Sequence, residues 1–471
     1  MIQIEGAEVA KHNQKQDCWI VLHGKVWDVS EFLDGHPGGA AVIFKYAGGD
    51  ATEAYEEVHD PELVSSTLPA AKCLGPLRPD SLPKAQPVAS PKSSPTTATK
   101  SELPPLRTIV NVGDFEKVAE KYLTPAGWAY YSSGAEDEYS ITEAHRLFRK
   151  ITFRPRVMRK VEPISTDVNI LGYNSSLPVY ISPTGTGRYA HKDAECIFSR
   201  GAGRAGIIYC MPTTSNHRAV LEARTKPDQP VFLQLYTTRD RAKAQAMIRN
   251  AEFLGAKAVF VTVDSPVLGR RERDERVMVA EGGDASANTG VARTGSMSIL
   301  NPMLTWEDLK WLRKTTSLPL VLKGIATVED AVLAFHHGVQ GIVLSHHGGR
   351  SLDTTQAPIL TLLEIRKYAA HLLSPEIRDR FQIFIDGGFR RGTDIIKALA
   401  LGATAVGIGR PSLYSVCAGY GEAGLKRLLQ MLQFEIETGM ALAGATSVTE
   451  LVPELLNTER AENEVSRRVK L

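Results

Sequence analysis

From about residue 106 onward, short apolar runs alternate with longer stretches of helical periodicity. Each run ends in a polar or glycine-rich cluster, and a helix-like stretch follows it. Short, almost continuously apolar runs are typical of parallel strands that are buried on both faces. The pattern therefore predicts repeated βα units. The runs are Pro178–Ser182, Gly206–Cys210, Val231–Tyr236, Ala258–Asp264, Leu320–Lys323, Gly341–Ser345, Gln382–Asp386 and Ala403–Gly409.

The number of runs decides between two arrangements of a parallel sheet. Eight strands are the number that closes a (β/α)8 barrel. An open, doubly wound sheet is the competing arrangement, but no G-x-G-x-x-G follows the first run. We therefore expect residues 106–471 to fold as a TIM-type barrel with a charged C-terminal tail, which puts the chain in the α/β class.

The first 75 residues follow a different pattern, which predicts a small α+β domain. Cys18–Val29 indicates two strands around a turn at Gly24-Lys25, and residues 40–46 and 51–57 indicate two short helices. Residues 76–105 are rich in Pro, Ser, Thr and Ala and contain almost no large apolar side chains. Such a segment cannot bury a core, so we expect a linker between two domains.

Composition is ordinary for a globular protein, with 43% hydrophobic and 23% charged residues. No apolar run reaches the roughly 18 residues of a membrane span, and nothing indicates a nucleic-acid partner. Residues 1–75 carry 5 Lys/Arg against 12 Asp/Glu, although the chain as a whole is +2. An acidic front domain suits docking of a cationic partner. The first residues resemble neither a secretory signal nor a mitochondrial presequence, so we expect a cytoplasmic protein, or one of the mitochondrial intermembrane space whose presequence has been removed.

Polar residues gather where the predicted strands end. In a barrel of this type these ends meet at one rim, where the chemistry takes place. Strand ends are polar in any case because loops begin there, but that explanation does not account for Lys, Asp, His and Arg all lying at such ends. The rim candidates are Pro183, Thr184, Gly185, Gln234, Tyr236, Thr262, Asp264, Lys323, Ser345, His347, Arg350, Asp386, Gly387, Gly388, Arg390, Gly409 and Arg410.

The last two strand ends predict a phosphate site. Asp386-Gly-Gly-Phe-Arg390 and Gly407-Ile-Gly-Arg410 follow strands seven and eight, where barrels commonly hold a phosphate. Glycine frees backbone N–H groups, and two arginines add charge. We expect a phosphate-bearing cofactor or substrate.

The rear domain resembles the FMN-dependent L-2-hydroxy acid oxidase and dehydrogenase family. The resemblance rests on Ser345-His-His-Gly-Gly-Arg-Ser-Leu-Asp353, with support from Tyr130-Tyr-Ser-Ser-Gly-Ala, Gln234-Leu-Tyr, Thr262-Val-Asp and Leu322-Lys-Gly. It implies that the rim candidates other than Tyr236, Asp264, His347 and Arg350 bind FMN, and that a small 2-hydroxy acid is the substrate. It also implies a homotetramer.

The resemblance assigns roles to individual side chains. His347 is expected to take a proton from the substrate, and Asp264 to stabilise its imidazolium. Arg350 is expected to bind the substrate carboxylate together with Tyr130, with Arg271 as a second cation. The remaining roles fall to Tyr236, which would contact the substrate hydroxyl, and Lys323, which would stabilise negative charge on reduced flavin.

Departures from the family pattern bear on substrate choice and flavin contact. Gly185 stands where alanine is usual, and its missing methyl predicts a larger pocket. Met211 lies at a variable pocket position and is adaptable. Tyr209 replaces a small hydroxyl residue that contacts flavin in relatives, and His346 replaces an asparagine and is not expected to be the base.

The front domain resembles the cytochrome b5 family. Phe32-Leu-Asp-Gly-His-Pro-Gly-Gly39 is similar to its haem-binding loop, and His59 in Glu57-Val-His-Asp60 matches the second axial ligand. The resemblance implies a b-type haem held by His36 and His59. Two histidines fill both axial positions, which favours electron transfer, and without C-x-x-C-H the haem is held non-covalently.

Together the two resemblances imply an L-2-hydroxy acid dehydrogenase that passes electrons from FMN through haem to cytochrome c. L-lactate, oxidised to pyruvate, is the first candidate substrate, and L-mandelate or another larger acid is the alternative. An oxygen-reducing oxidase and a non-catalytic haem module on an inactive barrel are the competing functions. The complete set of His347, Asp264, Lys323 and Arg350 argues against the inactive module.

Overall fold

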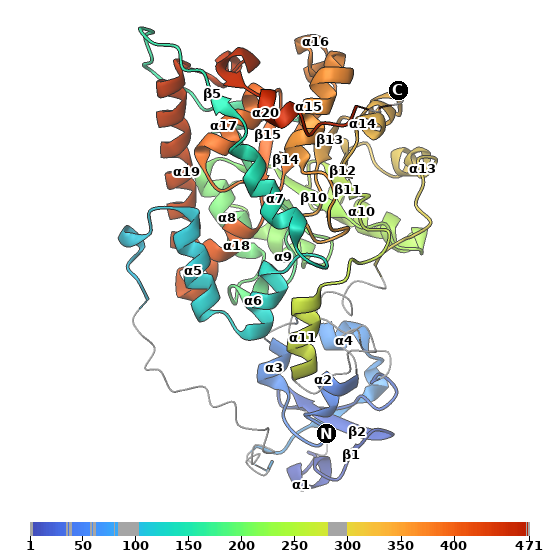
Figure 1. Ribbon diagram of the computed structural model, residues 1–471. Coiled ribbons are helices and arrows are strands. Elements are labelled where there is room, and N and C mark those ends of the chain that lie inside the picture. Colours follow the sequence, from blue (N-terminus) through green and yellow to red (C-terminus); the bar gives the residue numbers. More distant parts are fainter. Residues whose placement is uncertain are drawn as a thin grey trace. The chain divides into compact units, whose positions relative to one another are not determined.

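The computed structural model (Figure 1) describes residues 3–33, 36, 40–56, 59, 63–79, 81–82, 103–280, 299–467 and 469. The chain divides into two compact units. One comprises Met1–Pro104 and Arg273–Met297, and the other comprises Pro105–Glu272 and Ser298–Leu471. None of the helices in the described ranges is both long and apolar enough to span a bilayer.

The second unit contains the predicted barrel, which closes in the order β10-β11-β12-β13-β14-β15-β8-β9, all pairs parallel. Each strand falls on one of the eight apolar runs, so the prediction of a (β/α)8 barrel is confirmed. The strands are β8 Val179–Ile181, β9 Ile208–Met211, β10 Val231–Leu235, β11 Val259–Thr262, β12 Leu320–Ile325, β13 Gly341–Leu344, β14 Gln382–Asp386 and β15 Ala405–Ile408.

The barrel interior explains why polar residues gather at one rim. Its centre is filled by side chains such as Tyr180, Phe232, Phe260 and Phe384, all at most 1% exposed. The Phe232 and Phe260 rings lie 5.4 Å apart. Because side chains alternate along a strand, the position two residues further on also faces inward. These next inward positions, at the carboxyl ends of the strands, carry the polar candidates.

Helices and short accessory strands surround the barrel (Figure 1). Between or after the barrel strands come α8 Cys196–Ala205, α9 His217–Glu222, α10 Arg241–Phe253, α13 Asp308–Thr315, α14 Val328–His336, α15 Pro358–Tyr368, α16 Pro375–Arg378, α17 Gly392–Ala400, α18 Arg410–Val416, α19 Gly421–Ala443 and α20 Glu459–Glu462. Before the barrel lie α5 Val112–Tyr122, α6 Pro125–Ser132 and α7 Tyr139–Phe148; the accessory strands are β5 Thr152–Phe153, β6 Val168–Ile170, β7 Tyr173–Ser175 and β16 Leu456–Asn457. Side-chain N-caps from Asn111, Thr124 and Thr327 start three of these helices.

The first unit is a small α+β fold, as predicted. Its sheet has the order β1-β2-β3-β4, formed by β1 Asn13–Gln14, β2 Asp17–Leu22, β3 Lys25–Asp28 and β4 Cys73–Pro76. Its helices are α1 Gly6–Val9, α2 Ala40–Phe44, α3 Thr52–Glu56, α4 Leu63–Thr67 and α11 Glu272–Ala280, the last belonging to this unit from Arg273 onward. The turn between β2 and β3 is formed by His23 and Gly24, with φ of 52° and 70°. The turn therefore lies one residue earlier than predicted, because Lys25 already pairs with Leu22.

The ends of two predicted segments differ from expectation. β4 continues to Pro76, and backbone bonds join Leu77 to Gly24 and Arg78 to Ile4. Residues at the start of the predicted linker are thus part of the front unit, while residues 83–102 lie outside the described ranges. So does most of the polar insertion expected at 277–300, of which Val277–Ala280 ends helix α11.

Candidate active site

The carboxyl end of β13 leads into the loop that carries His347. His347 Nδ1 lies 2.8 Å from Asp264 Oδ1, and the residue has a left-handed φ of 58°. On the other side of the ring, Nε2 lies 3.3 Å from the Tyr236 hydroxyl, and the two rings are stacked. The backbone N–H of His347 donates to Ser345 Oγ at 3.0 Å. The structure thus brings the predicted residues Asp264 and Tyr236 to the His347 imidazole, and Ser345 to its backbone.

Asp264 is held as a carboxylate inside the protein. Burial alone would raise the pKa of this carboxyl, but the His347 imidazole and the Lys323 ammonium hold the pKa below its usual value. Burial also raises the pKa of the Tyr236 phenol, so that Tyr236 keeps its proton. The arrangement orients the imidazole so that Nδ1–H donates to Asp264, which leaves Nε2 able to accept a proton.

Gly324, next to Lys323, makes room for Asp264. Its φ is +111°, and an added Cβ would lie 2.5 Å from both Cβ and Cγ of Asp264. We expect Gly324→Ala to destabilise the fold by roughly 2–3 kcal/mol or more and to slow flavin reduction by displacing Asp264. Chemical denaturation and rapid-mixing kinetics measure the two effects.

Gly172→Ala is the matched control for this prediction. Gly172 has a φ of +89°, but no atom lies within 4 Å of its added Cβ. The Gly172→Ala variant therefore shows the effect of backbone strain on stability and rate without a steric clash. Equal losses of stability and rate in both variants would show that Asp264 is not held by the space at Gly324.

A second group of candidates surrounds Lys323. The buried Lys323 Nζ lies 3.1 Å from Asp386 Oδ2 and donates to Ser345 Oγ at 2.9 Å. Burial would lower the pKa of Lys323, but the Asp386 and Asp264 carboxylates outweigh it and raise the pKa. On the strands β10 and β11, Gln234 Nε2 donates to Thr262 Oγ1 at 2.9 Å, and Thr262 is the register partner of Lys323. Lys323 therefore places a permanent positive charge in the barrel mouth.

Arg350 and Tyr130 form a third group. The guanidinium of Arg350 donates to the backbone oxygen of Tyr130 and lies over its ring, 4.8 Å from the centroid. The Tyr130 hydroxyl accepts a hydrogen bond from Thr186 Oγ1 at 3.3 Å. Arg271, 8% exposed, lies near enough to lower the pKa of Tyr236, although burial outweighs that effect. The predicted carboxylate clamp is thus held in place from two sides.

The predicted phosphate site contains two arginines with different partners. Arg390 pairs with Glu116 at 2.9 Å through Nη2, and its buried Nη1 has no hydrogen-bond partner within the described protein. Arg410 donates from Nε, Nη1 and Nη2 to the backbone oxygens of Tyr131, Gly348 and Ser133, each at 2.8 Å. Burial lowers the pKa of Arg410 to about 10. Arg410 thus cross-links backbone segments, whereas Arg390 keeps a donor for a ligand.

The glycines at the same place have a packing role as well. Gly387 and Gly388 have φ of 90° and 86°. An added Cβ at Gly387 would lie 2.7 Å from Cε1 of His346, and one at Gly388 would lie 2.8 Å from the Ala144 oxygen in α7. At Gly409, by contrast, an added Cβ would meet only Thr184 and Ser182 at 3.6 Å or more. Of the three, Gly409 leaves the most open backbone.

The departures from the family pattern have distinct outcomes. An added Cβ at Gly185 would lie 2.7 Å from Thr214 Oγ1, so a hydroxyl fills the space that we expected a missing methyl to open. Met211 is fully buried at the end of β9. Tyr209 packs against Phe198 of α8, with ring centroids 5.9 Å apart, which places it between barrel and helix. Burial lowers the pKa of His346 to about 4, consistent with a neutral, non-basic imidazole.

The residues of the barrel mouth fit FMN. Among the described side chains, buried hydroxyls of Ser182 and Thr184 after β8, Nε of Arg350 and Nη1 of Arg390 have no hydrogen-bond partner within the protein. Buried polar groups of this kind are normally paired. Hydroxyl and guanidinium donors at the ends of the first and seventh strands match what a ribityl phosphate requires.

In the front unit, His36 and His59 lie close enough together to share one metal ion. The imidazole centroids of His36 and His59 lie 5.9 Å apart. Metal–nitrogen bonds of about 2 Å on each side would fit one iron atom between the rings. An apolar cluster that includes Leu33, Ala51 and Val64 forms the core of the same unit. Two imidazoles at this separation on an apolar module fit a bis-histidine haem.

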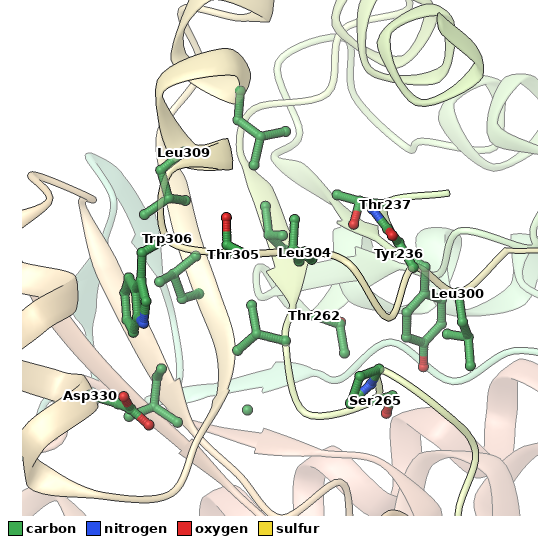
Figure 2. Close-up of a pocket in the computed structure, with 18 residues that line it drawn as sticks. Tyr236, Thr237, Thr262, Ser265, Leu300, Leu304, Thr305, Trp306, Leu309 and Asp330 are labelled. Carbon is green, nitrogen blue, oxygen red and sulfur yellow. The ribbon is translucent and has the colours of Figure 1, made fainter. Parts of the chain in front are cut away.

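A cavity of about 240 Å³ lies beside the candidate residues Tyr236 and Thr262. Figure 2 shows Tyr236, Ser265 and Leu300 at one end of it and Trp306, Leu309 and Asp330 at the other. We call it the side cavity. Its lining comes mainly from β11, β12 and the segment that leads into α13.

Two serines of the candidate site, Ser265 and Ser351, were not predicted from the sequence. Ser265 Oγ lies 3.2 Å from His347 Nδ1 and 3.1 Å from Ser351 Oγ. The sequence does place each serine directly after a predicted site residue, Ser265 after Asp264 and Ser351 after Arg350. Serine is too common in loops for adjacency alone to single it out.

Comparison with protein families matches both units. The family described as FMN-dependent dehydrogenase matches residues 119–458. The family described as cytochrome b5-like heme/steroid binding domain matches residues 5–81.

Individual relatives resemble either the whole chain or its rear part. L-lactate dehydrogenase (cytochrome) of Wickerhamomyces anomalus is 37% identical over 471 residues, covering 98% of this chain and 81% of that protein. Glycolate oxidase of Spinacia oleracea is 40% identical over 357 residues, covering 73% and 94%. Among solved structures, a flavocytochrome b2 mutant is 37% identical with a TM-score of 0.71, covering 79% and 92%. A mandelate oxidase mutant is 32% identical with a TM-score of 0.65, covering 74% and 98%.

Proposed function

Because the chain belongs to the FMN-dependent dehydrogenase family and carries a cytochrome b5-like haem domain before the barrel, we propose that it is a flavocytochrome b2-type enzyme. It oxidises an L-2-hydroxy acid, with L-lactate to pyruvate as the principal reaction. The electrons pass from FMN through haem to a cytochrome, which we identify as cytochrome c. The relative that matches both units is named for the same activity.

One observation carries the proposal. A histidine hydrogen-bonded to a buried carboxylate, a buried lysine and a held arginine all lie at the carboxyl ends of strands of one closed barrel. Removing hydrogen from the carbon and oxygen of a hydroxy acid needs a base, an anchor for the carboxylate and an electron acceptor. The chain supplies the first two itself.

His347 acts as the base, through Nε2. The Nδ1–H donates to Asp264, so the free nitrogen faces the Tyr236 hydroxyl and the open mouth. When Nε2 takes a proton, the imidazolium is stabilised by the buried Asp264 carboxylate. Tyr236 keeps its phenolic proton and can donate to the substrate oxygen.

Arg350 binds the substrate carboxylate, with help from Tyr130 and Arg271. Among the described residues, Arg350 Nε has no hydrogen-bond partner, and the contacts to Tyr130 fix the position of the guanidinium. A guanidinium matches a carboxylate with two parallel hydrogen bonds, which fixes orientation as well as position. Fixing the acid in this way brings its hydroxyl-bearing carbon to one place beside His347.

FMN supplies the two-electron acceptor, and haem supplies a one-electron relay. Lys323 would hold negative charge at the flavin ring, while Arg390 and Gly409 would hold its phosphate. Thr184, Gln234 and Thr262 provide further polar contacts at the rim. Pro183, Gly185, Ser345, Asp386 to Gly388 and Arg410 shape the pocket around them.

An anaerobic mixing series tests the proposal. The holoenzyme is mixed with L-lactate, glycolate, L-mandelate and longer L-2-hydroxy acids, and flavin bleaching and haem reduction are followed by absorbance. We expect L-lactate to bleach flavin first and to reduce haem afterwards. If L-lactate bleaches flavin but haem stays oxidised, the relay is refuted; if no hydroxy acid bleaches flavin, the whole function is refuted.

Two alternatives have an observation in their favour. Glycolate oxidase resembles the rear part of the chain at 40% identity, which supports an oxidase. Oxidase activity would produce hydrogen peroxide in step with pyruvate and leave cytochrome c oxidised.

A larger hydroxy acid as substrate is supported by two solved structures, a mandelate oxidase mutant and a flavocytochrome b2 mutant with benzoylformate. In that case L-mandelate would bleach flavin faster than L-lactate.

We also propose a homotetramer, which rests on the family resemblance. Light scattering of the purified holoenzyme measures the mass directly. A mass of four chains supports the proposal, and any other mass contradicts it.

A further inference from the structure

The hydroxyl of Ser265 lies at the centre of a small hydrogen-bond network. It donates to Asp264 Oδ1 at 3.2 Å and lies 3.2 Å from His347 Nδ1. Its third neighbour is Ser351 Oγ, at 3.1 Å. Ser265 is 7% exposed, so water competes little for these contacts. One hydroxyl therefore touches both members of the base–carboxylate pair.

The directions of the hydrogen bonds follow from the donors available. The Nδ1–H of His347 has its shortest contact with Asp264 Oδ1, at 2.8 Å. The Ser265 proton goes to the same carboxylate, so Ser265 Oγ can accept from Ser351. The chain of donors runs from Ser351 to Ser265 to Asp264.

Backbone packing fixes the position of Ser351. An added Cβ at Gly269 would lie 2.0 Å from the backbone oxygen of Ser351 and 2.7 Å from that of Arg350. The segment after β11, which carries Ser265, therefore lies directly against the segment after β13, which carries His347 and Ser351. The two serines face each other because these two loops are in contact.

We propose that Ser265 and Ser351 are positioning residues for the oxidation of the hydroxy acid, acting through Asp264 and His347. Their linked hydroxyls hold the carboxylate and the Nδ1 side of the imidazole in one arrangement, so that Nε2 stays directed at the substrate. The inference rests on the proposed function, because it assigns His347 the role of base. Neither serine touches substrate or cofactor in this role.

The network also has an electrostatic effect with a definite sign. A hydroxyl that donates to Asp264 neutralises part of its negative charge. Without that donor, the carboxylate attracts a proton on the neighbouring imidazole more strongly. Loss of the Ser265 hydroxyl should therefore move the acidic limb of the kcat/KM profile to higher pH, which a purely structural defect would not do.

The side cavity makes a clean pair of variants feasible. Ser265 lines this cavity (Figure 2), so we expect the site to accept the added methyl group of threonine or valine. S265T keeps the hydroxyl and adds a methyl, whereas S265V has the same shape without the hydroxyl. The comparison of S265V with S265T removes one hydroxyl at nearly constant volume.

The kinetic test follows anaerobic flavin reduction of the holoenzyme by L-lactate. We expect S265V to reduce flavin roughly tenfold more slowly than S265T, with substrate Kd changed less than about twofold. The acidic limb should move up by about half a pH unit. S351A should reduce flavin a few-fold more slowly than the parent protein. The double variant S265V/S351A should reduce flavin no more slowly than S265V alone, because Ser351 acts through Ser265. Equal rates and pH profiles for S265V and S265T would overturn the inference.

A second readout does not depend on turnover. Diethylpyrocarbonate acylates neutral imidazole, and mass spectrometry of the peptide that contains His347 measures its modification against pH in substrate-free enzyme. We expect the curve for S265V to lie at higher pH than that for S265T, with His347→Gln giving the background. If wild type fails to bleach flavin while the curves still separate, the proposed function fails and the hydrogen-bond network stands. Superimposed curves refute the network itself.

Discussion

His347→Gln is expected to slow anaerobic flavin reduction by L-lactate about a thousandfold or more while FMN remains bound. Glutamine can still donate to Asp264, so the buried carboxylate keeps a partner and the loop keeps its hydrogen bond. What is lost is a nitrogen that can accept a proton, since an amide is not basic. Stopped-flow absorbance at the flavin band measures the rate, and the spectrum of the purified variant measures FMN content.

His371→Gln serves as the control for this change. His371 is an exposed histidine in the short helix after α15, away from the barrel mouth. In the His371→Gln variant, L-lactate should bleach the flavin at the same rate as in the parent protein. A His347→Gln variant that reduced flavin at an undiminished rate would remove His347 as the base and require another acceptor in the mouth.

His59→Ala is the second change with a large expected effect, and it separates the two units of the protein. Loss of one of two facing imidazoles should remove haem or leave it loosely bound. Reduction of cytochrome c by L-lactate should then fall by at least about a hundredfold, because the relay is lost. Flavin bleaching should continue at close to the parental rate, since the barrel holds its own base, clamp and lysine.

The control for His59→Ala lies in the same unit. His12 stacks on Trp19 with ring centroids 3.4 Å apart and contacts Asp17, so it is a structural histidine of the sheet edge. His12→Ala should keep the haem absorbance and the reduction of cytochrome c. If His59→Ala kept both as well, the assignment of His59 as an axial ligand would be wrong.

The barrel could be predicted from sequence because its information is local and repeated. Each strand lies on a short apolar run, and several runs carry a chemically distinctive residue at or near the carboxyl end, such as Asp264, Lys323 or Asp386. Periodicity then places the side chains at the ends of the strands on one rim. The family resemblance added the roles of these residues, and the pairing of His347 with Asp264 agrees with them.

Contacts made by loops could not be predicted in the same way. That Thr214 fills the space beside Gly185 depends on how two βα loops approach each other. The Ser265–Ser351 contact depends on loops after β11 and β13 that are 86 residues apart. No sequence pattern encodes such distances, because they result from the packing of irregular backbone. The same holds for the end of the front unit, where backbone bonds from Leu77 to Gly24 and from Arg78 to Ile4 extend the fold past β4.

The three carbonyls bound by Arg410 have a consequence for how the enzyme is made. The carbonyls belong to Gly348, Ser133 and Tyr131, which lie 62, 277 and 279 residues before Arg410 in the chain. Gly348 is in the loop after β13, and Tyr131 and Ser133 are at the end of α6. A contact of such long range forms only after both partners have been synthesised and brought together. The ribosome must therefore release nearly the whole barrel before the loops of the mouth can be locked. We expect nascent chains that end before residue 410 to be unable to retain flavin, so that the coenzyme joins a barrel whose synthesis is almost complete.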